Sequence, residues 1–546
     1  MLMLAGPLTT IVVTPWISFD PVSLPKLVVL TSLSFFGGGL LLAKKRELLK
    51  TLGREVKIPA VAFLVLMCVT LFASGSGIVQ QVFGVFGRNT GLLAYTSLVL
   101  ILLCSSVLQD NNYYRRILYS LVYTSFFMTV YCLVQMAGLD PIMWSQYDTF
   151  GTLGNINFLS AFLGLSILVT VALTFDNQIK TFLRIVFLAK SFLDTYIIFT
   201  TGSIQGLMMV VAGIGVLGFF LLYIKNYKLR RPVLILYGLS GLGMISLTSL
   251  GIVNKGPLAP FIFQPSVVFR GDYWHAGWAL TLKFPFFGAG LDSYGDWYRE
   301  IRGLVSTTRT NPDRIANTAH NIFLDISASG GFLLLIPYLF LIGLIFFRSF
   351  KYLRNSQTFD PVFTALFIAW LAYQVQALVS INQIGVGVWG FLFSGCLLGY
   401  QWSQDSKTTS KSARSYKFKG KLLGAKESLV ASVALLLGVG LAVTPMAADV
   451  EFRNARNSGS AQELLQSTES LGASLFHKEL ALDLVMQAGE PGREPALQLA
   501  KRIVTEHPRS FFTWVVLLNL PNASEETRAE ALEKIKQLDP FNPNYR

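Results

Sequence analysis

One of the four histidines, His320, stands where a polar stretch turns into a long apolar run. An unprotonated imidazole can take a proton from a hydroxyl group, because the ordinary pKa of a histidine side chain is about 6.5. A histidine at the start of a helix is also often a cap or a core residue. His320 is therefore a candidate general base whose surroundings must support that role.

Arginines occur in the segments that we expect on the same side of the molecule as this histidine. A guanidinium group binds phosphate through two parallel hydrogen bonds, and preorganised positive charge stabilises negative charge that develops during a reaction. Some of these arginines could instead be solvated surface charges, and Arg88 could be a snorkelling anchor at a membrane surface. The candidates for phosphate contact are Arg88, Arg270, Arg309 and Arg314.

The sequence does not favour a metal site or a disulfide framework. Asp292 and Asp296 are the only close acid pair in the polar segment before His320, which is a weak metal pattern. We expect neither a metal ion nor an organic cofactor. The four cysteines lie far apart within apolar runs, where packing accounts for them: Cys68, Cys104, Cys132 and Cys396.

The elements that must position these residues are membrane helices. Of the 546 residues, 52% are hydrophobic and only 14% charged, and apolar runs near the ~20 residues that cross a bilayer recur along the chain. We therefore predict an all-α fold, a polytopic membrane protein with about 12–13 transmembrane helices. The first run has no signal-peptide pattern, so we expect a membrane span there. The predicted spans lie near residues 3–19, 25–43, 58–75, 91–108, 116–137, 157–175, 182–200, 204–224, 232–252, 320–347, 360–378, 382–402 and 427–446.

The positions of lysine and arginine predict the orientation. The formal net charge of +14 could suggest nucleic-acid binding, but the basic residues fall in alternate connections between the spans. The positive-inside rule places those connections in the cytoplasm, so the charge reflects topology and we expect no nucleic acid. The N-terminus is then cytoplasmic, whereas a long loop (residues 253–319) and the chain after residue 446 lie outside. The basic connections are residues 44–57, 115–116, 180–184, 225–231, 348–354 and 407–426.

The long loop contains an aromatic segment, residues 267–283, that includes Arg270 and Tyr273. As a helix, this segment would place aromatic rings at the membrane surface and Arg270 in polar space; an interfacial anchor helix is the alternative. Two acids, Asp194 and Asp325, fall near the outer ends of predicted spans. Such acids usually face a wet cavity or each other, although we expect structural hydrogen bonding for Asp194.

The last part of the chain, residues 447–546, is charged and helical in composition, and we call it the tail. Two of its segments, residues 495–508 and 530–543, echo each other at about the ~34-residue spacing of a tetratricopeptide helical pair. An incidental helical hairpin is the alternative. We therefore predict two domains, a membrane domain of residues 1–446 and a helical tail of residues 447–546 that could dock a protein partner.

Five motifs occur in order along residues 20–445: Phe86-Gly-Arg88-Asn-Thr-Gly, Gly151-Thr-Leu-Gly-Asn155-Ile-Asn157, Arg270-Gly-Asp-Tyr-Trp, Pro285-Phe-Phe-Gly-Ala-Gly and His320-Asn321-Ile-Phe-Leu with Gly330-Gly331. Taken together, these motifs resemble the O-antigen ligase and polymerase superfamily of bacterial envelope glycosyltransferases. The chain departs from the pattern at Gln205, because relatives often have Ser-Arg-Gly where this chain has Ser203-Ile-Gln205-Gly206.

This resemblance implies a multi-pass protein of the bacterial inner membrane that takes a glycan from undecaprenyl diphosphate at the periplasmic face. The acceptor is a hydroxyl of a lipid, glycan or protein. We expect the O-antigen ligase type of transfer without a metal; O-antigen polymerase and protein O-oligosaccharyltransferase are the alternatives. His320 would be the base. The expected substrate-binding residues are Arg88, Arg270, Arg309, Arg314, Tyr273, Asn155, Asn157, Asn321 and Asp325.

Two unrelated classes of function remain as alternatives. A small-anion transporter would also use outward arginines and buried acids, but we see no convincing inverted repeat of the kind that transporters have. A scaffold whose tail recruits partners would tolerate mutation of the outer loops. Membrane lipids are expected neighbours in every case.

Overall fold

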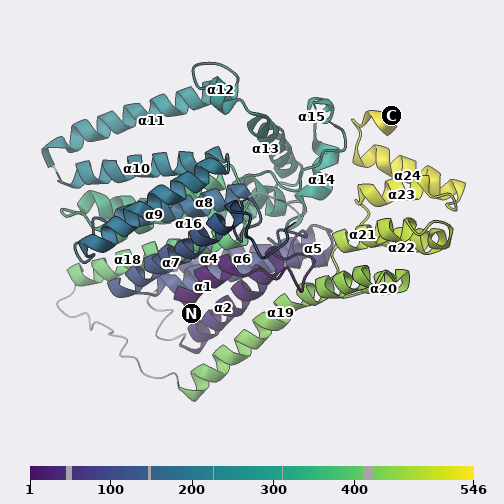
Figure 1. Ribbon diagram of the computed structural model, residues 1–546, viewed down its shortest axis with the longest axis horizontal. Coiled ribbons are helices and arrows are strands. Elements are labelled where there is room, and N and C mark those ends of the chain that lie inside the picture. The colour runs from purple at the N-terminus through teal and green to yellow at the C-terminus, as the bar shows by residue number, and fades with distance from the viewer. Residues whose placement is uncertain (45–51, 145–148, 226, 310, 410–423, 546) are drawn as a thin grey trace.

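The computed structural model describes residues 1–44, 52–144, 149–225, 227–309, 311–409 and 424–545. These residues form helices joined by loops, and no strand occurs among them (Figure 1). The fold is therefore all-α and polytopic, as predicted. Eight helices of this part of the chain are long and apolar enough to cross a membrane: α2 (Ser23–Ala43), α4 (Arg54–Ala73), α7 (Asn111–Met136), α8 (Ile156–Leu173), α10 (Ile204–Lys225), α11 (Arg230–Ile252), α16 (Ile322–Asn355) and α19 (Ala425–Ser458).

Shorter helices account for the other predicted spans. The span predicted over residues 3–19 is too long, because α1 ends at Ile11. Pro15 follows in the next turn, where a helix would need the N–H that proline lacks. The helix of the seventh span contains Lys190 and Asp194 and is less apolar. These remaining helices are α1 (Leu2–Ile11), α6 (Leu92–Ser106), α9 (Thr181–Thr200), α17 (Pro361–Ala377) and α18 (Ile384–Thr409), the last with the apolar part Ile384–Tyr400.

Helices α17 and α18 lie at the centre of the bundle. Helix α18 packs against α6, and α17 packs against α8. Trp370 of α17 and Trp389 of α18 are among the largest fully buried side chains. Helix α11 lies at the periphery. Only 6% of its most apolar stretch is buried, as expected for a helix that faces lipid.

The connections gather at two opposite ends of the molecule. Figure 1 shows the tail beside α5 (Ile78–Phe83), α14 (Tyr294–Ile301) and α15 (Leu304–Thr308) at one end, and the turn between α10 and α11 at the other. We call these the tail end and the far end. Basic residues of the far end pair with acids there, as in Arg115–Asp176 at 2.8 Å and Arg348–Glu55 at 2.5 Å.

This sorting agrees with the predicted alternation of basic and polar connections, and the side of the membrane on which each end lies stays a prediction. Some predicted cytoplasmic basic residues lie outside the described part of the chain: Lys45, Arg46, Lys50, Lys411, Arg414, Lys417, Lys419 and Lys421.

The tail continues directly from α19, and the predicted domain boundary at residues 446/447 lies within that helix, next to Pro445. The buried residues of the tail, such as Leu482, Ile503 and Ile535, form a hydrophobic cluster of their own. The two echoing segments correspond to α22 and α24; their assignment as tetratricopeptide repeats stays a prediction. The tail helices are α20 (Ala461–Ser467), α21 (Leu475–Met486), α22 (Arg493–Glu506), α23 (Phe511–Asn519) and α24 (Glu525–Leu538).

Candidate active site

The aromatic segment of the long loop forms α13 (Pro265–Lys283), which packs against the start of α16. Arg270, Tyr273 and Gly277 follow one another at helical spacing on one face. A side chain at Gly277 would meet the Cβ of Ala319 at 3.1 Å, so the two segments approach closely there. The segment is thus helical, and it does more than anchor the loop, because it carries Arg270 and Tyr273 to the residues before α16.

A second close contact fixes the start of α16. Gly331 has φ +69° and kinks the helix. The N–H groups of Ala289 and Gly290 donate to the carbonyl oxygens of Ala328 and Ser329 at 2.8 and 3.0 Å, and the N–H of Phe332 donates to Pro285 at 2.8 Å. The element that approaches Gly331 is the loop that contains the Pro285-Phe-Phe-Gly-Ala-Gly motif.

His320 lies just before α16 in a left-handed conformation, with φ +51°. Its ring stacks on Tyr273, with the ring centroids 5.4 Å apart. The side chain of Asn321 caps α16 by accepting from the N–H groups of Phe323 and Leu324 at 3.0 and 3.2 Å. The cap function considered for His320 therefore belongs to Asn321, and the imidazole is free for another role.

Asp325, in the first turn of α16, accepts a hydrogen bond from the N–H of Ala319 at 2.7 Å. Ala319 directly precedes His320, so this bond holds the backbone that carries the imidazole. The charge of Asp325 also interacts with that of Arg88. Asp325 thus supports the two groups of most chemical interest.

Arg88 lies in a loop between α5 and α6 that is anchored to the long loop by acids. The carboxylate of Asp292 accepts from the N–H of Val85 at 2.7 Å and from the hydroxyl of Thr90 at 3.2 Å. The side chain of Gln80 donates to Asp296 at 2.9 Å. The acid pair considered as a weak metal pattern therefore joins two loops, and the described residues contain no group of three or more potential metal ligands.

Arg88 and Arg270 come together at His320. The Nη1 atom of Arg88 and the Nε atom of Arg270 are buried and have no hydrogen-bond partner among the described residues. Within the part of the chain that the structure describes, Arg270 donates to the carbonyl of Ser266 in its own helix, at 3.3 Å, and to no other acceptor. Burial and then the positive charges of the two arginines lower the pKa of His320 to about 4.

Two incompletely bonded guanidinium groups thus lie beside an imidazole that is neutral at pH 7. Burial lowers the pKa of each guanidinium group as well, because a buried cation lacks its hydration shell. An anion bound between Arg88 and Arg270 would satisfy these donors and offset the uncompensated charge. The arrangement can hold a phosphate group next to a proton acceptor.

The remaining two candidate arginines, Arg309 and Arg314, contact residues of α13. Arg309 forms an ion pair with Asp272 at 3.2 Å, and the guanidinium of Arg314 stacks on the ring of Phe269 at 3.6 Å. Asp272 and Phe269 flank Arg270 in the sequence of α13. Asp272 therefore balances the charge of Arg309, whereas the charge of Arg314 is more available to an anion.

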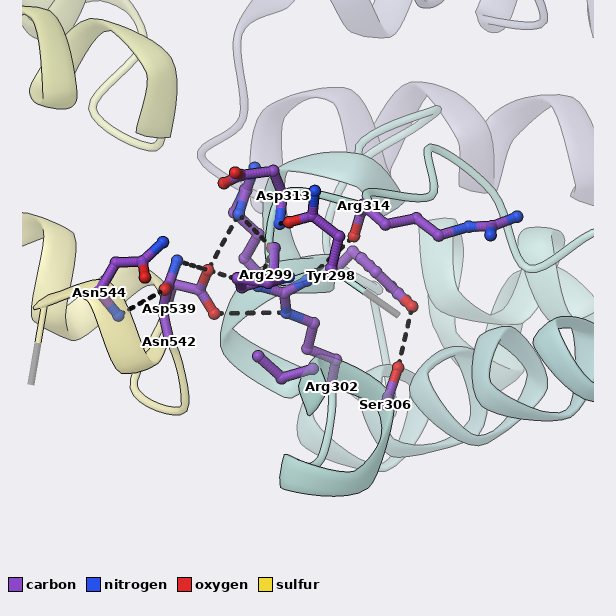
Figure 2. Close-up of polar contacts among 12 residues, drawn as sticks. Tyr298, Arg299, Arg302, Ser306, Asp313, Arg314, Asp539, Asn542 and Asn544 are labelled. Carbon is purple, nitrogen blue, oxygen red and sulfur yellow. Dashed lines mark hydrogen bonds and ion pairs between the residues drawn. The ribbon is translucent and has the colours of Figure 1, made fainter. Parts of the chain in front are cut away.

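Two further arginines of the long loop are bound by the tail, a contact that the sequence did not predict. Figure 2 shows Arg299 and Arg302 of the long loop both directed at Asp539 of the tail, with Arg314 pointing away from them. The nitrogens of Arg299 and Arg302 lie 2.9 and 2.5 Å from the Asp539 carboxylate. Arg302 also donates to the carbonyls of Pro312 and Arg314, at 2.6 and 3.0 Å. The tail thereby holds the segment that leads to His320.

Asn155 and Asn157 have contacts elsewhere. Asn155 caps α8 by accepting from the N–H of Asn157 at 2.8 Å, and Asn157 accepts from the hydroxyl of Ser203 at 3.0 Å. These bonds join the Gly-Asn-x-Asn motif to the turn before α10, close in sequence to Gln205. Both polar atoms of the Gln205 side chain are buried without a partner among the described residues. The structure therefore brings these two motifs together, away from the contacts of His320.

Asp194 has the structural role that we expected. It forms a buried ion pair with Lys190 in the same helix and accepts from the hydroxyl of Thr129 at 2.5 Å. Lys190 was not singled out from the sequence, although its i, i+4 spacing from Asp194 is the signal that could have identified it.

The comparisons with known proteins agree with this geometry. Residues 185–339 match a family model described as O-antigen ligase. The matched stretch runs from α9 to the kinked part of α16 and contains Arg270, Tyr273 and His320. No curated protein matches the chain. The match supports the predicted similarity to the O-antigen ligase and polymerase superfamily and, with it, an enzyme that acts on glycans at a membrane.

Proposed function

We propose that this protein transfers a glycan from undecaprenyl diphosphate to an acceptor hydroxyl at the tail end of the membrane domain, as an O-antigen ligase does. The observation that carries this proposal is the convergence of Arg88 and Arg270, each with a buried unpartnered nitrogen, on the neutral ring of His320. The family match over residues 185–339 supports the class of reaction.

In the proposed reaction, His320 accepts the proton of the acceptor hydroxyl while the oxygen forms a bond to the anomeric carbon of the glycan. The bond between that carbon and the diphosphate breaks, and the electron pair leaves with the diphosphate oxygen. Arg88 and Arg270 stabilise the negative charge that develops there, which removes the need for a metal ion. Tyr273 orients the imidazole, and Asp325 positions its backbone.

Donor binding would also activate the base. In the free protein, the charges of Arg88 and Arg270 contribute to the low pKa of His320. A bound diphosphate offsets these charges and raises the pKa toward the ordinary value of about 6.5. The imidazole therefore becomes a stronger proton acceptor when the leaving group is in place.

The remaining expected residues would contribute from outside the cluster around His320. Arg314 is the next cation available to the donor, and Arg309 would join it if its pair with Asp272 opened. Asn155 and Asn157 would contact the donor only beyond the cluster around His320. Asn321 contributes through its cap of α16.

The proposed localisation is the bacterial inner membrane, with the N-terminus in the cytoplasm and the long loop and the tail in the periplasm. Residues 1–446 form the proposed transferase domain and residues 447–546 the proposed tail domain. The acceptor distinguishes ligase, polymerase and protein O-oligosaccharyltransferase, which share one donor site. Asp194 would have suited a transporter as a free acid, but it is paired with Lys190.

The test is glycan transfer by the purified protein in lipid nanodiscs. Undecaprenyl-diphosphate-linked glycan from the source cells is incubated with lipid A core, a second glycan or a hydroxyl-bearing protein, with and without a chelator. We expect transfer to one of these acceptors that the chelator does not reduce. Chelator-sensitive transfer would contradict the metal-free mechanism, and an unchanged rate in Arg270→Ala would contradict the proposed donor site.

A further inference from the structure

A cavity of about 600 Å³ lies between the tail and the loops of the membrane domain. Its lining comes from residues 79–89, from the 295–317 part of the long loop and from tail residues between 472 and 545. None of the residues that we assign to the reaction lines it. The volume is within the range of ordinary ligand sites, about 300–1,000 Å³.

The cavity shares walls with the candidate active site. Asn89, which lines it, directly follows Arg88. Asp313, Ile315 and Asn317 also line it. The residues between them face the other way, since Arg314 stacks on Phe269 and Ala316 belongs to the cluster around Tyr273. This segment is therefore a partition, with the cavity on one side and α13 on the other.

Aromatic rings form one part of the lining. The rings of Phe86 and Phe476 stack with their centroids 4.4 Å apart and lie 5° from parallel, and Phe476 is still 41% exposed. Phe511 of α23 packs beneath the guanidinium of Arg299 at 4.1 Å. Flat aromatic faces of this kind suit the C–H surfaces of sugar rings, because the π-face is electron-rich and those C–H groups are weakly positive.

The rest of the lining is partly aliphatic, as at Val79, Leu475 and Leu538, and partly made of polar groups that suit hydroxyls. Asn89 and Asn317 offer amide groups, and Gln80 offers its amide oxygen, because its nitrogen donates to Asp292 and Asp296. The two arginines of the lining are paired, Arg299 with Asp539 and Arg509 with Glu300. The cavity therefore lacks the free positive charge that a phosphate site needs, and its carboxylates disfavour an alkyl chain.

Two half-buried acidic residues of the lining complete this picture. Burial raises the pKa of Glu479 to about 7 and that of Asp296 to about 6. Glu479 accepts from the hydroxyl of Ser510 at 2.6 Å. A carboxyl group that is partly protonated near neutral pH can both donate to and accept from a sugar hydroxyl. The reaction proposed above uses neither acid.

We propose that this cavity binds the sugar chain of the lipid-linked donor, and that the tail forms its outer wall. The inference rests on the proposed function, because the sugar chain is joined directly to the diphosphate that Arg88 and Arg270 hold. A sugar chain that extends from the bound diphosphate toward Asn89 enters this cavity. The tail is then a part of the donor site in addition to any docking role.

The test separates the sugar site from the phosphate site by using two halves of the donor. Mild acid releases the glycan from its diphosphate, and undecaprenyl diphosphate without a glycan serves as the second probe. Each is titrated calorimetrically into the full-length protein in nanodiscs. The variants are Phe476→Ala and Glu479→Gln, with Leu471→Ala and Glu490→Gln as matched controls, because Leu471 is 81% exposed and Glu490 is 85% exposed.

We expect Phe476→Ala and Glu479→Gln to bind the released glycan at least about tenfold more weakly than the wild type, and the controls to bind it equally well. Both cavity variants should keep wild-type affinity for undecaprenyl diphosphate. Glu479→Gln keeps the size of the side chain, so it remains informative if Phe476→Ala loosens the tail.

Equal binding of the released glycan by the wild type and both cavity variants would overturn the proposal. Failure of the wild type to bind the released glycan, while it binds undecaprenyl diphosphate, would overturn it too and leave the phosphate site intact. Unchanged binding of undecaprenyl diphosphate by Arg88→Ala would count against the proposed function itself, which keeps the two failures distinct.

Discussion

Arg302 of the long loop and Asp539 at the end of α24 form an ion pair in which the two side chains are 1% and 0% exposed. Arg302 is therefore a buried cation whose charge is balanced by the tail. Because the same guanidinium donates to the backbone of Pro312 and Arg314, the pair connects the tail to the segment that precedes His320. Asp539 is thus a positioning residue for the candidate active site.

Asp539→Asn should loosen this segment. Removal of one partner of a buried ion pair is destabilising by about 3–5 kcal/mol, because the other charge stays uncompensated. We expect faster hydrogen exchange over residues 299–318 and a lower kcat for glycan transfer. Glu533→Gln, at an exposed position of the same helix, is the matched control and should change neither. Wild-type exchange in Asp539→Asn would contradict the positioning role.

The pH dependence of glycan transfer should show how Arg88 and Arg270 affect the pKa of His320. A base must be unprotonated, and the low pKa of His320, about 4, keeps it unprotonated until the pH falls through that value. We therefore expect the acid limb of kcat/KM, which reports the free protein, at low pH. The acid limb of kcat should lie higher, since the bound diphosphate offsets Arg88 and Arg270 and raises the pKa.

Arg270→Gln provides the check on this electrostatic account. It removes one of the positive charges that lower the pKa of His320, so the acid limb of kcat/KM should move to higher pH even as the rate falls. A histidine-labelled NMR titration of the free protein would show the same shift directly. A limb that stays in place or moves to lower pH would exclude Arg270 as a cause of the low pKa.

Gly331→Ala should destabilise the start of α16. Its φ of +69° is unfavourable for alanine, and the added Cβ would lie 2.4 Å from the carbonyl of Phe286. We expect a loss of about 1–3 kcal/mol, measured by thermal unfolding in nanodiscs. Gly343→Ala in the same helix is the control, because its added Cβ meets nothing within 4 Å, and it should be neutral or slightly stabilising. Equal stability of the two variants would show that the kink at Gly331 is not required.

The parts of the fold that depend on local sequence were predictable. Apolar runs of membrane length identified α8, α10 and α16, because hydropathy over about twenty residues is a local signal. The extent of α1 was predicted wrongly. The apolar run continues past Ile11, but Pro15 lacks the N–H that a longer helix would need. Short central helices such as α17 were also recognisable.

The residues of the candidate site were predictable where they belong to recognisable sequence motifs. His320, Arg88 and Arg270 were selected from motif resemblance and sidedness, and the structure brings them together. The pairing of Arg299 and Arg302 with Asp539 had no such signal, because the partners lie more than 200 residues apart and no local pattern links an acid after α24 to the long loop. The cavity at the tail was equally unpredictable, since it arises from three distant segments.

The most direct test of the central claim compares His320→Ala with Arg270→Ala in two measurements on the same preparation, namely glycan transfer and binding of undecaprenyl diphosphate. We predict that His320→Ala lowers the transfer rate by about 10²–10⁴-fold, the usual contribution of a general base, and still binds the lipid diphosphate as the wild type does. Arg270→Ala should weaken both transfer and binding. Wild-type transfer by His320→Ala would contradict the account.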